Sequence, residues 1–351
     1  MTTRTAHDRS GATAPDAGDD SSNSRSDGRG SGSGGSGGGW VPGRGLRALR
    51  AVAVAATVPY LLLKSAWLAG SHLGIPEGSV LREPGLFFTV ANAVTLAMDA
   101  TLVVLVLLLT QAWGMRIRAW LLTVPVFVAA GLLAPIVIAF PAQLLGGLVG
   151  GGASEAAAAR EPFLDGWVHD VVYTGFGLQA LALAGLFLPY ARRRWGRRWQ
   201  GRAAIPGGRA TRPAAVLAAL TGLAVAGVQG YWALGGSAGL DAGMRDRRDW
   251  NTAVLCGTYG LLALAAAVGG VLLVYGARLG LRRVRGPLAL AWIGAGSSLT
   301  WGAWLTLASL SVTDPAKQST LEMYLTYAGQ MITGLLVAGV LARCLTARQA
   351  E

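Results

Sequence analysis

Residues 64–74, Lys-Ser-Ala-Trp-Leu-Ala-Gly-Ser-His-Leu-Gly, recur in outline at residues 229–239, Gln-Gly-Tyr-Trp-Ala-Leu-Gly-Gly-Ser-Ala-Gly. The shared pattern is Lys/Gln-x-x-Trp-x-x-Gly-x-x-x-Gly, and its two copies stand 165 residues apart. A second pair of matches, Tyr173-x-Gly175 and Tyr327-x-Gly329, stands 154 residues apart. The two offsets differ by a modest loop length, so the pattern predicts that the chain is internally duplicated.

The composition of the chain is that of a membrane protein. Apolar residues make up 52% of the chain, charged residues make up 14%, and the mean hydropathy is +0.46. Soluble domains contain about 25% charged residues. About 20 apolar residues are needed to cross the hydrocarbon core of a bilayer. Eight stretches approach that length: 49–70, 87–112, 119–142, 168–190, 213–235, 252–277, 287–311 and 322–345.

The duplication and the spans together predict the architecture. Each copy holds four spans, and an even number gives both copies the same orientation, so the repeat is expected to be parallel. The expected fold is an all-α integral membrane protein of eight transmembrane helices, arranged as two parallel four-helix repeats after a disordered tail. The expected parts are a Gly/Ser-rich cytoplasmic tail at 1–43, a four-span unit at 44–191, an Arg-rich cytoplasmic connector at 192–212 and a second four-span unit at 213–347.

Arginine residues cluster at alternate ends of the predicted spans. They precede the first span, follow the second, fourth and sixth spans, and end the chain, as at Arg44, Arg116, Arg192, Arg278 and Arg343. Basic residues near span ends are retained on the cytoplasmic side. Both termini are therefore predicted to be cytoplasmic in a multi-pass protein of the inner (cytoplasmic) cell membrane. The same distribution accounts for the net charge of +12, and no nucleic-acid partner is expected.

The second copy of the repeated pattern runs Tyr231-Trp232-Ala233-Leu234-Gly235-Gly236-Ser237-Ala238-Gly239-Leu240. It resembles the signature of a small bacterial four-span membrane family of unknown function. The first copy, from Ala66 to Gly74, resembles that signature more loosely. The resemblance implies a four-span helical unit that is present twice in tandem. It implies no activity, because none is known for that family.

Lys64 is a charged residue inside an apolar span, where an ammonium group is costly and points to a function. The next span carries Asn92, Thr95 and Asp99 at i, i+3 and i+7, which places three polar groups on one helical face. Burying a lysine and an aspartate together costs far less than burying either alone. Lys64 and Asp99 are therefore expected to face each other, with Asn92 nearby. Three interpretations stay open: a structural pair, a functional polar site, or a lysine that snorkels to the interface without a partner.

His169, Asp170 and Tyr173 begin the fourth span at its outer end, and His72 follows the first span. These groups are expected to approach one outer vestibule. A proton relay from His169 to Asp99 is one hypothesis, because histidine titrates near neutral pH and Tyr173 is one turn below His169. Two imidazoles and a carboxylate also suit a zinc ion, but the spacing is not diagnostic. No metal site and no cofactor is predicted.

The connector after the fourth span is dense in arginine and tryptophan. Interleaved arginine and tryptophan suit anionic lipid headgroups at the cytoplasmic face, and arginines that only orient and anchor the chain give the same pattern. The residues assigned to headgroup contact are Arg192, Arg193, Arg194, Trp195, Arg197, Arg198, Trp199 and Arg202. The lipid bilayer is thus the expected partner, and the sequence identifies no protein partner.

The sequence contains no recognisable catalytic motif. It has no H-E-x-x-H, no Walker A pattern and no C-x-x-C. The prediction is a polytopic membrane component that is not an enzyme, for example a partner or sensor subunit of the envelope. The alternative is a small-solute or proton carrier or channel that uses the outer-facing polar site of the first four-span unit. A membrane enzyme acting on a lipid or isoprenoid is the third interpretation, and it is disfavoured because the clustered carboxylates that would hold a metal are missing.

Overall fold

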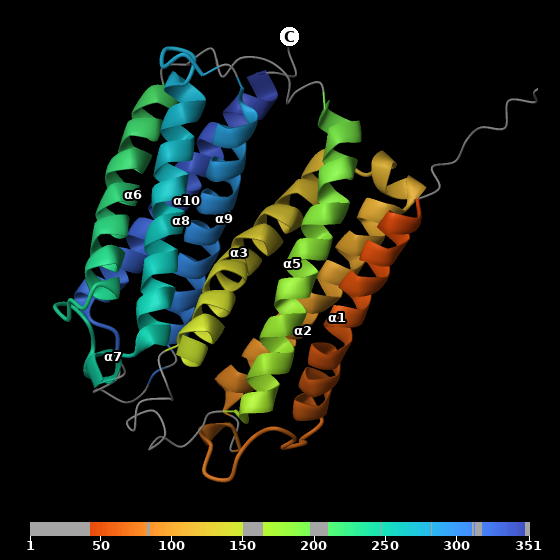
Figure 1. Ribbon diagram of the computed structural model, residues 1–351, viewed down its shortest axis with the longest axis vertical. Helices are drawn as coiled ribbons and strands as arrows, with labels where there is room; N and C mark the ends of the chain where they lie inside the picture. The colour runs from red at the N-terminus through yellow and green to blue at the C-terminus, as the bar shows by residue number, and fades with distance from the viewer. Residues whose placement is uncertain are drawn as a thin grey trace, which may run out of the picture. The chain divides into compact units, whose positions relative to one another are not determined.

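The computed structural model describes residues 43–82, 85–149, 164–196, 210–246, 248–281, 283–310, 312 and 318–347. Every regular element in these ranges is a helix (Figure 1). The predicted tail, apart from Gly43, and the middle of the predicted connector lie outside the described residues.

Long helices make up most of the described part of the chain. They are α1 (Arg44–Leu68), α2 (Leu86–Thr110), α3 (Ala119–Val149), α5 (Gly166–Trp195), α6 (Thr211–Ala233), α8 (Trp250–Tyr275), α9 (Arg285–Ser309) and α10 (Leu321–Ala347). Short helices stand in the turns: η1 (Val80–Arg82), η2 (Ala112–Arg116) and α7 (Ala242–Asp246). The first residues of the predicted connector continue α5, whose basic last turn complements the negative end of the helix dipole. Its last residues begin α6 at Thr211.

Seven of the long helices, all except α9, are long and apolar enough to cross a membrane. α9 has 25 residues, but small and polar residues dilute its apolar stretch, among them Ser297, Ser298 and Thr300. The expectation of an all-helical, multi-pass membrane fold is confirmed by these elements. The assignment of α9 as an eighth span stays a prediction.

α3 is longer than the predicted span 119–142. Its 31 residues give a helix about 46 Å long, whereas the hydrocarbon core is about 30 Å thick. A helix that is too long for the bilayer is accommodated by tilting. In Figure 1, α3 runs diagonally between the helices on either side of it.

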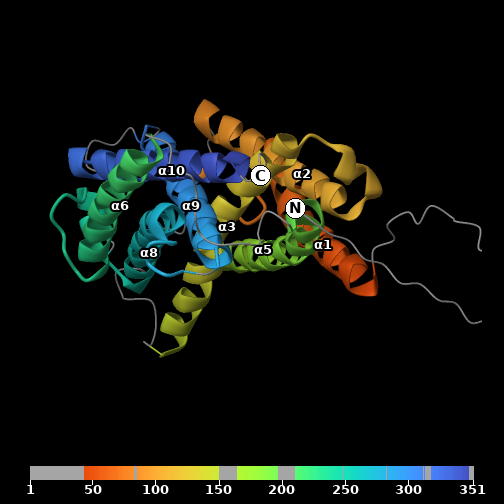
Figure 2. The same cartoon turned by 90° about the horizontal axis from the view of Figure 1, so that it is seen from above.

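The helices α1, α2, α3 and α5 pack around one apolar core. Ala53 of α1, Val106 of α2, Leu122 of α3 and Leu186 of α5 all belong to it and are almost completely buried. The other four long helices form a second group with its own core (Figures 1 and 2). α3 joins the two groups, since it packs against α8 and α9 as well as α2 and α5.

In the second group, glycine residues bring the helix backbones close together. A Cβ atom added to Gly294 of α9 would lie 2.3 Å from the backbone nitrogen of Ala266 in α8. A Cβ atom added to Gly269 of α8 would lie 2.3 Å from the backbone nitrogen of Ala291. Small residues at such crossings are a typical means of helix association in membranes.

The contact between α3 and α9 is also built on glycine. A Cβ atom added to Gly131 would lie 2.4 Å from the carbonyl oxygen of Gly296. Beside this crossing, Ser297 Oγ donates a hydrogen bond to the Gly131 carbonyl oxygen at 3.0 Å. One turn further along, Trp301 Nε1 donates to the Leu132 carbonyl oxygen at 3.1 Å. Ser297, one of the polar residues that lower the hydropathy of α9, therefore binds the neighbouring helix α3.

The loops that follow α1 and α6 share the same local structure. Trp67 Nε1 donates to the carbonyl oxygen of Leu73 at 2.8 Å, and Trp232 Nε1 donates to that of Ala238 at 2.9 Å. The four glycines of the two Gly-x-x-x-Gly patterns have φ between 72° and 114°, the left-handed region that favours glycine.

The second glycine of each loop lies against the beginning of the fourth helix of its own group. A Cβ atom on Gly74 would lie 2.3 Å from Val168 Cγ2, and one on Gly239 would lie 2.8 Å from Glu322 Cβ. Val168 and Glu322 stand 154 residues apart, which is the offset of the Tyr-x-Gly matches. The two loops thus make equivalent contacts in the two groups.

Candidate functional site: a buried ion pair between α1 and α2

One face of α1 carries the polar side chains of the site. Thr57, Tyr60 and Lys64 are spaced so that they share a face of the helix. Thr57 and Lys64 are each only 1% exposed. The Thr57 hydroxyl donates to the Ala53 carbonyl oxygen of its own helix at 2.8 Å. The face therefore points into the first group of helices and not toward its surroundings.

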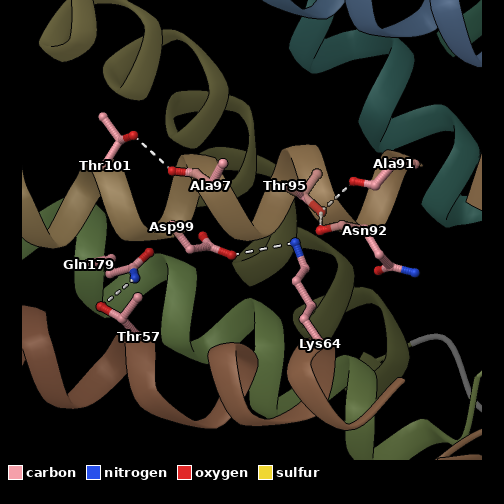
Figure 3. A network of polar contacts seen from close by, with 9 residues as sticks. All are labelled: Thr57, Lys64, Ala91, Asn92, Thr95, Ala97, Asp99, Thr101 and Gln179. Atoms are coloured by element: carbon pink, nitrogen blue, oxygen red, sulfur yellow. Dashed lines mark hydrogen bonds and ion pairs between the residues drawn. The ribbon is translucent and has the colours of Figure 1, made fainter. Parts of the chain in front are cut away.

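Lys64 meets Asp99 of α2 in this interior. The Lys64 Nζ lies 3.4 Å from Asp99 Oδ2 (Figure 3). Asp99 is 7% exposed, and the Lys64 ammonium also lies 3.9 Å from the centroid of the Tyr60 ring. A snorkelling lysine would be exposed at its tip, so that interpretation of Lys64 is wrong.

The energetics of such a pair are close to balance. At this separation two unit charges attract by about 5 kcal/mol if the effective dielectric constant is about 20. Removing each charge from water costs several kcal/mol. The desolvation cost of the two ions together equals or exceeds their attraction, and Tyr60 adds a cation–π contribution of about 2 kcal/mol for a desolvated cation. The pair therefore adds little net stability to the contact of α1 and α2.

The remaining polar groups of α2 are arranged differently. The Thr95 hydroxyl donates to the Ala91 carbonyl oxygen at 2.7 Å, so its own helix satisfies it. Asn92 is 7% exposed and lies on the same side of α2 as Asp99, but no contact joins it to the ion pair in Figure 3. Asn92 Nδ2 has no hydrogen-bond partner among the described residues.

α5 contributes a second polar contact to α1. Gln179 Nε2 donates to Thr57 Oγ1 at 2.9 Å, and both side chains are 1% exposed. Gln179 Oε1 has no hydrogen-bond partner in the described part of the chain. Thr57, Tyr60 and Gln179 were not among the residues expected from the sequence. For Tyr60 and Thr57 the available signal was their position, because they precede Lys64 by one and two turns on its own helical face.

At the beginning of α5, Tyr173 packs against the same apolar cluster as Tyr60, and among the described residues no ion pair joins His169 or Asp170 to Lys64 or Asp99. His169 and Asp170 are exposed, while Tyr173 is partly buried. The His169 and Tyr173 rings meet edge to face with centroids 4.2 Å apart. The row of rings then passes from Tyr173 to Phe176 at 6.2 Å and from Phe176 to Tyr60 at 4.9 Å. Phe176 has no group that can carry a proton, so this row of rings is not itself a proton relay, and the relay from His169 to Asp99 stays a hypothesis.

The proposed outer cluster does not have the arrangement of a metal site. Across the described residues, no three His, Cys, Asp or Glu side chains are placed to hold one metal ion. His72, like His169 and Asp170, is exposed.

The Arg-rich end of α5 divides into two kinds of arginine. Arg192 and Arg193 are exposed. Arg194 is partly buried; it donates to the carbonyl oxygen of Gly114 at 3.1 Å and to that of Ile117, and its guanidinium lies 5.5 Å from the Trp195 ring centroid. Arg194 therefore holds the α2–α3 turn against α5, which differs from its expected contact with headgroups. Other residues of the expected contact lie outside the described residues: Arg197, Arg198, Trp199 and Arg202.

The second group of helices carries an uncharged counterpart of the site. Gln229 stands at the position of Lys64 in the repeated pattern and is 2% exposed. A polar contact between the first and fourth helices also recurs: Thr333 of α10, at the position equivalent to Gln179, lies with its Oγ1 2.9 Å from Oγ1 of Thr221, one residue before the equivalent of Thr57. The charged pair therefore distinguishes the first group from the second.

Comparison of the chain with protein-family models, with curated proteins and with solved structures found no match.

Proposed function

We propose that the chain is a non-enzymatic component of the cell membrane, in which a buried ion pair fixes the packing of the first helices. The observation that carries the proposal is the closed contact of Lys64 and Asp99, which lie 3.4 Å apart and are 1% and 7% exposed. In this arrangement each charge compensates the other, and neither is accessible to a solute. The polytopic membrane character itself follows from the seven apolar helices.

The proposed topology has eight spans, with both termini cytoplasmic. α9 supports the eighth span because it packs against α3, α8 and α10, each of which is apolar enough to cross a membrane. In Figure 1 the colours show that successive long helices run in alternate directions along the bundle. The arginine-bearing ends of α1, α5 and α9 lie at the same end, as the positive-inside rule requires.

The proposal includes a parallel duplication of a four-helix unit, with each unit similar to the four-span family that the Trp-Gly pattern resembles. Its support is the pair of equivalent loops after α1 and α6, which share the indole-to-carbonyl hydrogen bond and the left-handed glycines. The polar contacts between the first and fourth helices of each group, Thr57 with Gln179 and Thr221 with Thr333, add to it. Anionic headgroups at the cytoplasmic face are the proposed partner of Arg192 and Arg193.

A carrier or channel for a proton or small solute is the second candidate. Four buried atoms in this region lack hydrogen-bond partners among the described residues: Lys64 Nζ and Asp99 Oδ2, which form the ion pair, and Asn92 Nδ2 and Gln179 Oε1 near it. Buried polar atoms of this kind are costly unless water or a ligand satisfies them. A polar path into the helix group would need such atoms to bind water or a solute, and they favour a carrier or channel over an enzyme.

Reconstitution of the purified full chain into liposomes separates the two candidates. Proton flux is followed with an internal pH-sensitive dye, and small-solute flux is followed by osmotic swelling. The proposal predicts that wild-type vesicles leak no faster than empty ones. Flux that is present in the wild type and lost in an Asp99→Asn variant of unchanged stability would overturn it in favour of a carrier. Ser71→Ala, on the exposed loop after α1, serves as the control substitution.

A further inference from the structure

A large apolar groove lies where the two groups of helices meet. It has a volume of about 740 Å³, and α3, α5 and α9 form its walls, with Leu345 of α10 at its border. Representative wall residues are Val126 and Leu133 of α3, Ala184 and Phe187 of α5, and Leu288 and Trp292 of α9. Phe187 and Trp292 stack across it with ring centroids 6.4 Å apart. Neither Lys64 nor Asp99 lines this groove.

Apart from its arginines and tryptophans, the groove has apolar walls. The Thr123 hydroxyl donates to the Ala119 carbonyl oxygen of its own helix at 2.6 Å. Leu181 and Ile293 line the groove and are 63% and 40% exposed, so it opens sideways onto the surroundings of the helices. In a membrane those surroundings are hydrocarbon. An apolar groove with a lateral opening therefore suits an acyl chain.

The charged residues of the groove are both basic and lie toward one end of it, where α5 ends and α9 begins. Arg192 is in the last turn of α5, where the helix dipole favours a cation. Arg285 is the first residue of α9, at the positive end of the α9 dipole. The first turn of α9 has neither an acidic residue nor a side-chain cap. Both arginines are exposed. An anion between them would complement Arg192, Arg285 and the beginning of α9 together.

The groove is long enough to hold an acyl chain. It follows α5 from Arg192 to Ala180 for about 18 Å of helix axis, and it follows α3 from Ala119 to Ile138 for about 28 Å, whereas half of the hydrocarbon core is about 15 Å deep. Trp195 also lines the groove beside the arginines, at the level where indole rings are favoured.

We propose that this groove binds one anionic phospholipid, with the phosphate between Arg192 and Arg285 and an acyl chain along Phe187 and Leu288. The inference rests on the membrane setting of the chain, but not on its sidedness or on the role of Lys64 and Asp99. The lipid fills the space between the two groups of helices and contacts both of them.

Native mass spectrometry of the full chain in detergent tests the headgroup contact. Phosphatidylglycerol and phosphatidylcholine with identical acyl chains are titrated separately, and retained lipid is counted. Wild type is expected to retain one phosphatidylglycerol in preference to phosphatidylcholine. Each arginine near an anionic headgroup is worth a factor of about 5 in affinity, so Arg192→Gln with Arg285→Gln should weaken phosphatidylglycerol binding by about 25-fold. The matched control, Arg278→Gln with Arg283→Gln, removes two exposed arginines outside the groove and should leave binding unchanged.

A second pair of variants tests the acyl-chain contact. Ala184→Phe fills the groove and should abolish retention of the lipid, whereas Ala303→Phe, at an exposed site of α9 outside the groove, should not. Thermal unfolding without added lipid establishes that each variant is folded. Equal retention of the two lipids in all variants would overturn the inference. Binding of inorganic phosphate alone with the same dependence on the arginines, or a dimer that Ala184→Phe dissociates, would also overturn it.

Discussion

Lys64 has two partners at once, the carboxylate of Asp99 and the face of the Tyr60 ring. Tyr60 also meets Phe176 of α5 edge to face, with centroids 4.9 Å apart. The ring therefore connects the charged contact of α1 and α2 to the third helix of the site. Its role depends on its aromatic face, since it is the ring that lies 3.9 Å from the ammonium.

Substitution of Tyr60 tests that role at the scale of the residue. Tyr60→Leu removes the aromatic face and is expected to lower the free energy of unfolding in detergent by about 2 kcal/mol. Tyr60→Phe keeps the face and should cost distinctly less. The measurement is chemical unfolding followed by tryptophan fluorescence. Equal losses in the two variants would show that the aromatic face is not what stabilises the ammonium.

The sequence predicted the charged residues of the site better than the neutral ones. Lys64 and Asp99 are conspicuous because a charge in an apolar span needs a partner. Gln179 could not be singled out in the same way, since an amide in a helix can be satisfied by its own backbone or by a neighbour. Arg194 was assigned to headgroups because composition does not reveal a nearby turn, and its contacts with Gly114 and Ile117 exist only in the folded chain.

At the scale of the element, the contact of α3 with α9 is the main joint between the two groups. Its close approach requires glycine on both helices, because a side chain on Gly131 would meet the backbone of Gly296 at 2.4 Å. Three prolines, Pro125, Pro135 and Pro141, lie within α3 on either side of this crossing. The groove proposed to bind lipid lies beside the same joint.

Enlarging Gly131 is expected to separate α3 from α9. Gly131→Leu should lower the free energy of unfolding by about 1–3 kcal/mol, the usual cost of overpacking. Gly147→Leu is the matched control, because it lies on the same helix and a Cβ atom there meets nothing within 4 Å. Thermal unfolding in detergent compares the two. Similar midpoints for both variants would contradict the tight crossing.

Hydropathy predicted where the helices begin and end better than it predicted which helices pack against each other. The predicted span 213–235 corresponds to α6, and 252–277 corresponds to α8, within a few residues at each end. Hydropathy predicted neither the extension of α3 beyond residue 142 nor the crossing at Gly131. Both depend on how one helix packs on another, and periodicity within a single helix does not contain that information.

At the scale of the whole molecule, the proposed parallel duplication makes a specific claim about sidedness. The loop after α1 and the loop after α6 should lie on the same, outer side of the membrane. The turns after α2 and α8 should lie on the cytoplasmic side, where their arginines are retained. An inverted repeat would instead place the first two loops on opposite sides.

Single cysteines and a membrane-impermeant maleimide measure this directly in intact cells. The background carries Cys256→Ala and Cys344→Ala, which remove the two buried native thiols. Labelling is expected at Ser71→Cys and Ser237→Cys in intact cells, and at Arg116→Cys and Arg278→Cys only after permeabilisation; all four positions are exposed. The reverse pattern would contradict the sidedness. Labelling of only one of the first two positions would contradict the parallel repeat.

Lys64 and Asp99 are proposed to form a structural contact inside the first group of helices. A double-mutant cycle with Lys64→Met, Asp99→Leu and the combination, measured as the free energy of unfolding in detergent, tests it most directly. Each single variant leaves an uncompensated buried charge and is expected to lose about 3 kcal/mol or more. The combination should return to within about 1 kcal/mol of the wild type, since an apolar pair of similar volume replaces the ions. Two small, additive losses would contradict the claim, because they would mean that the two charges do not depend on each other.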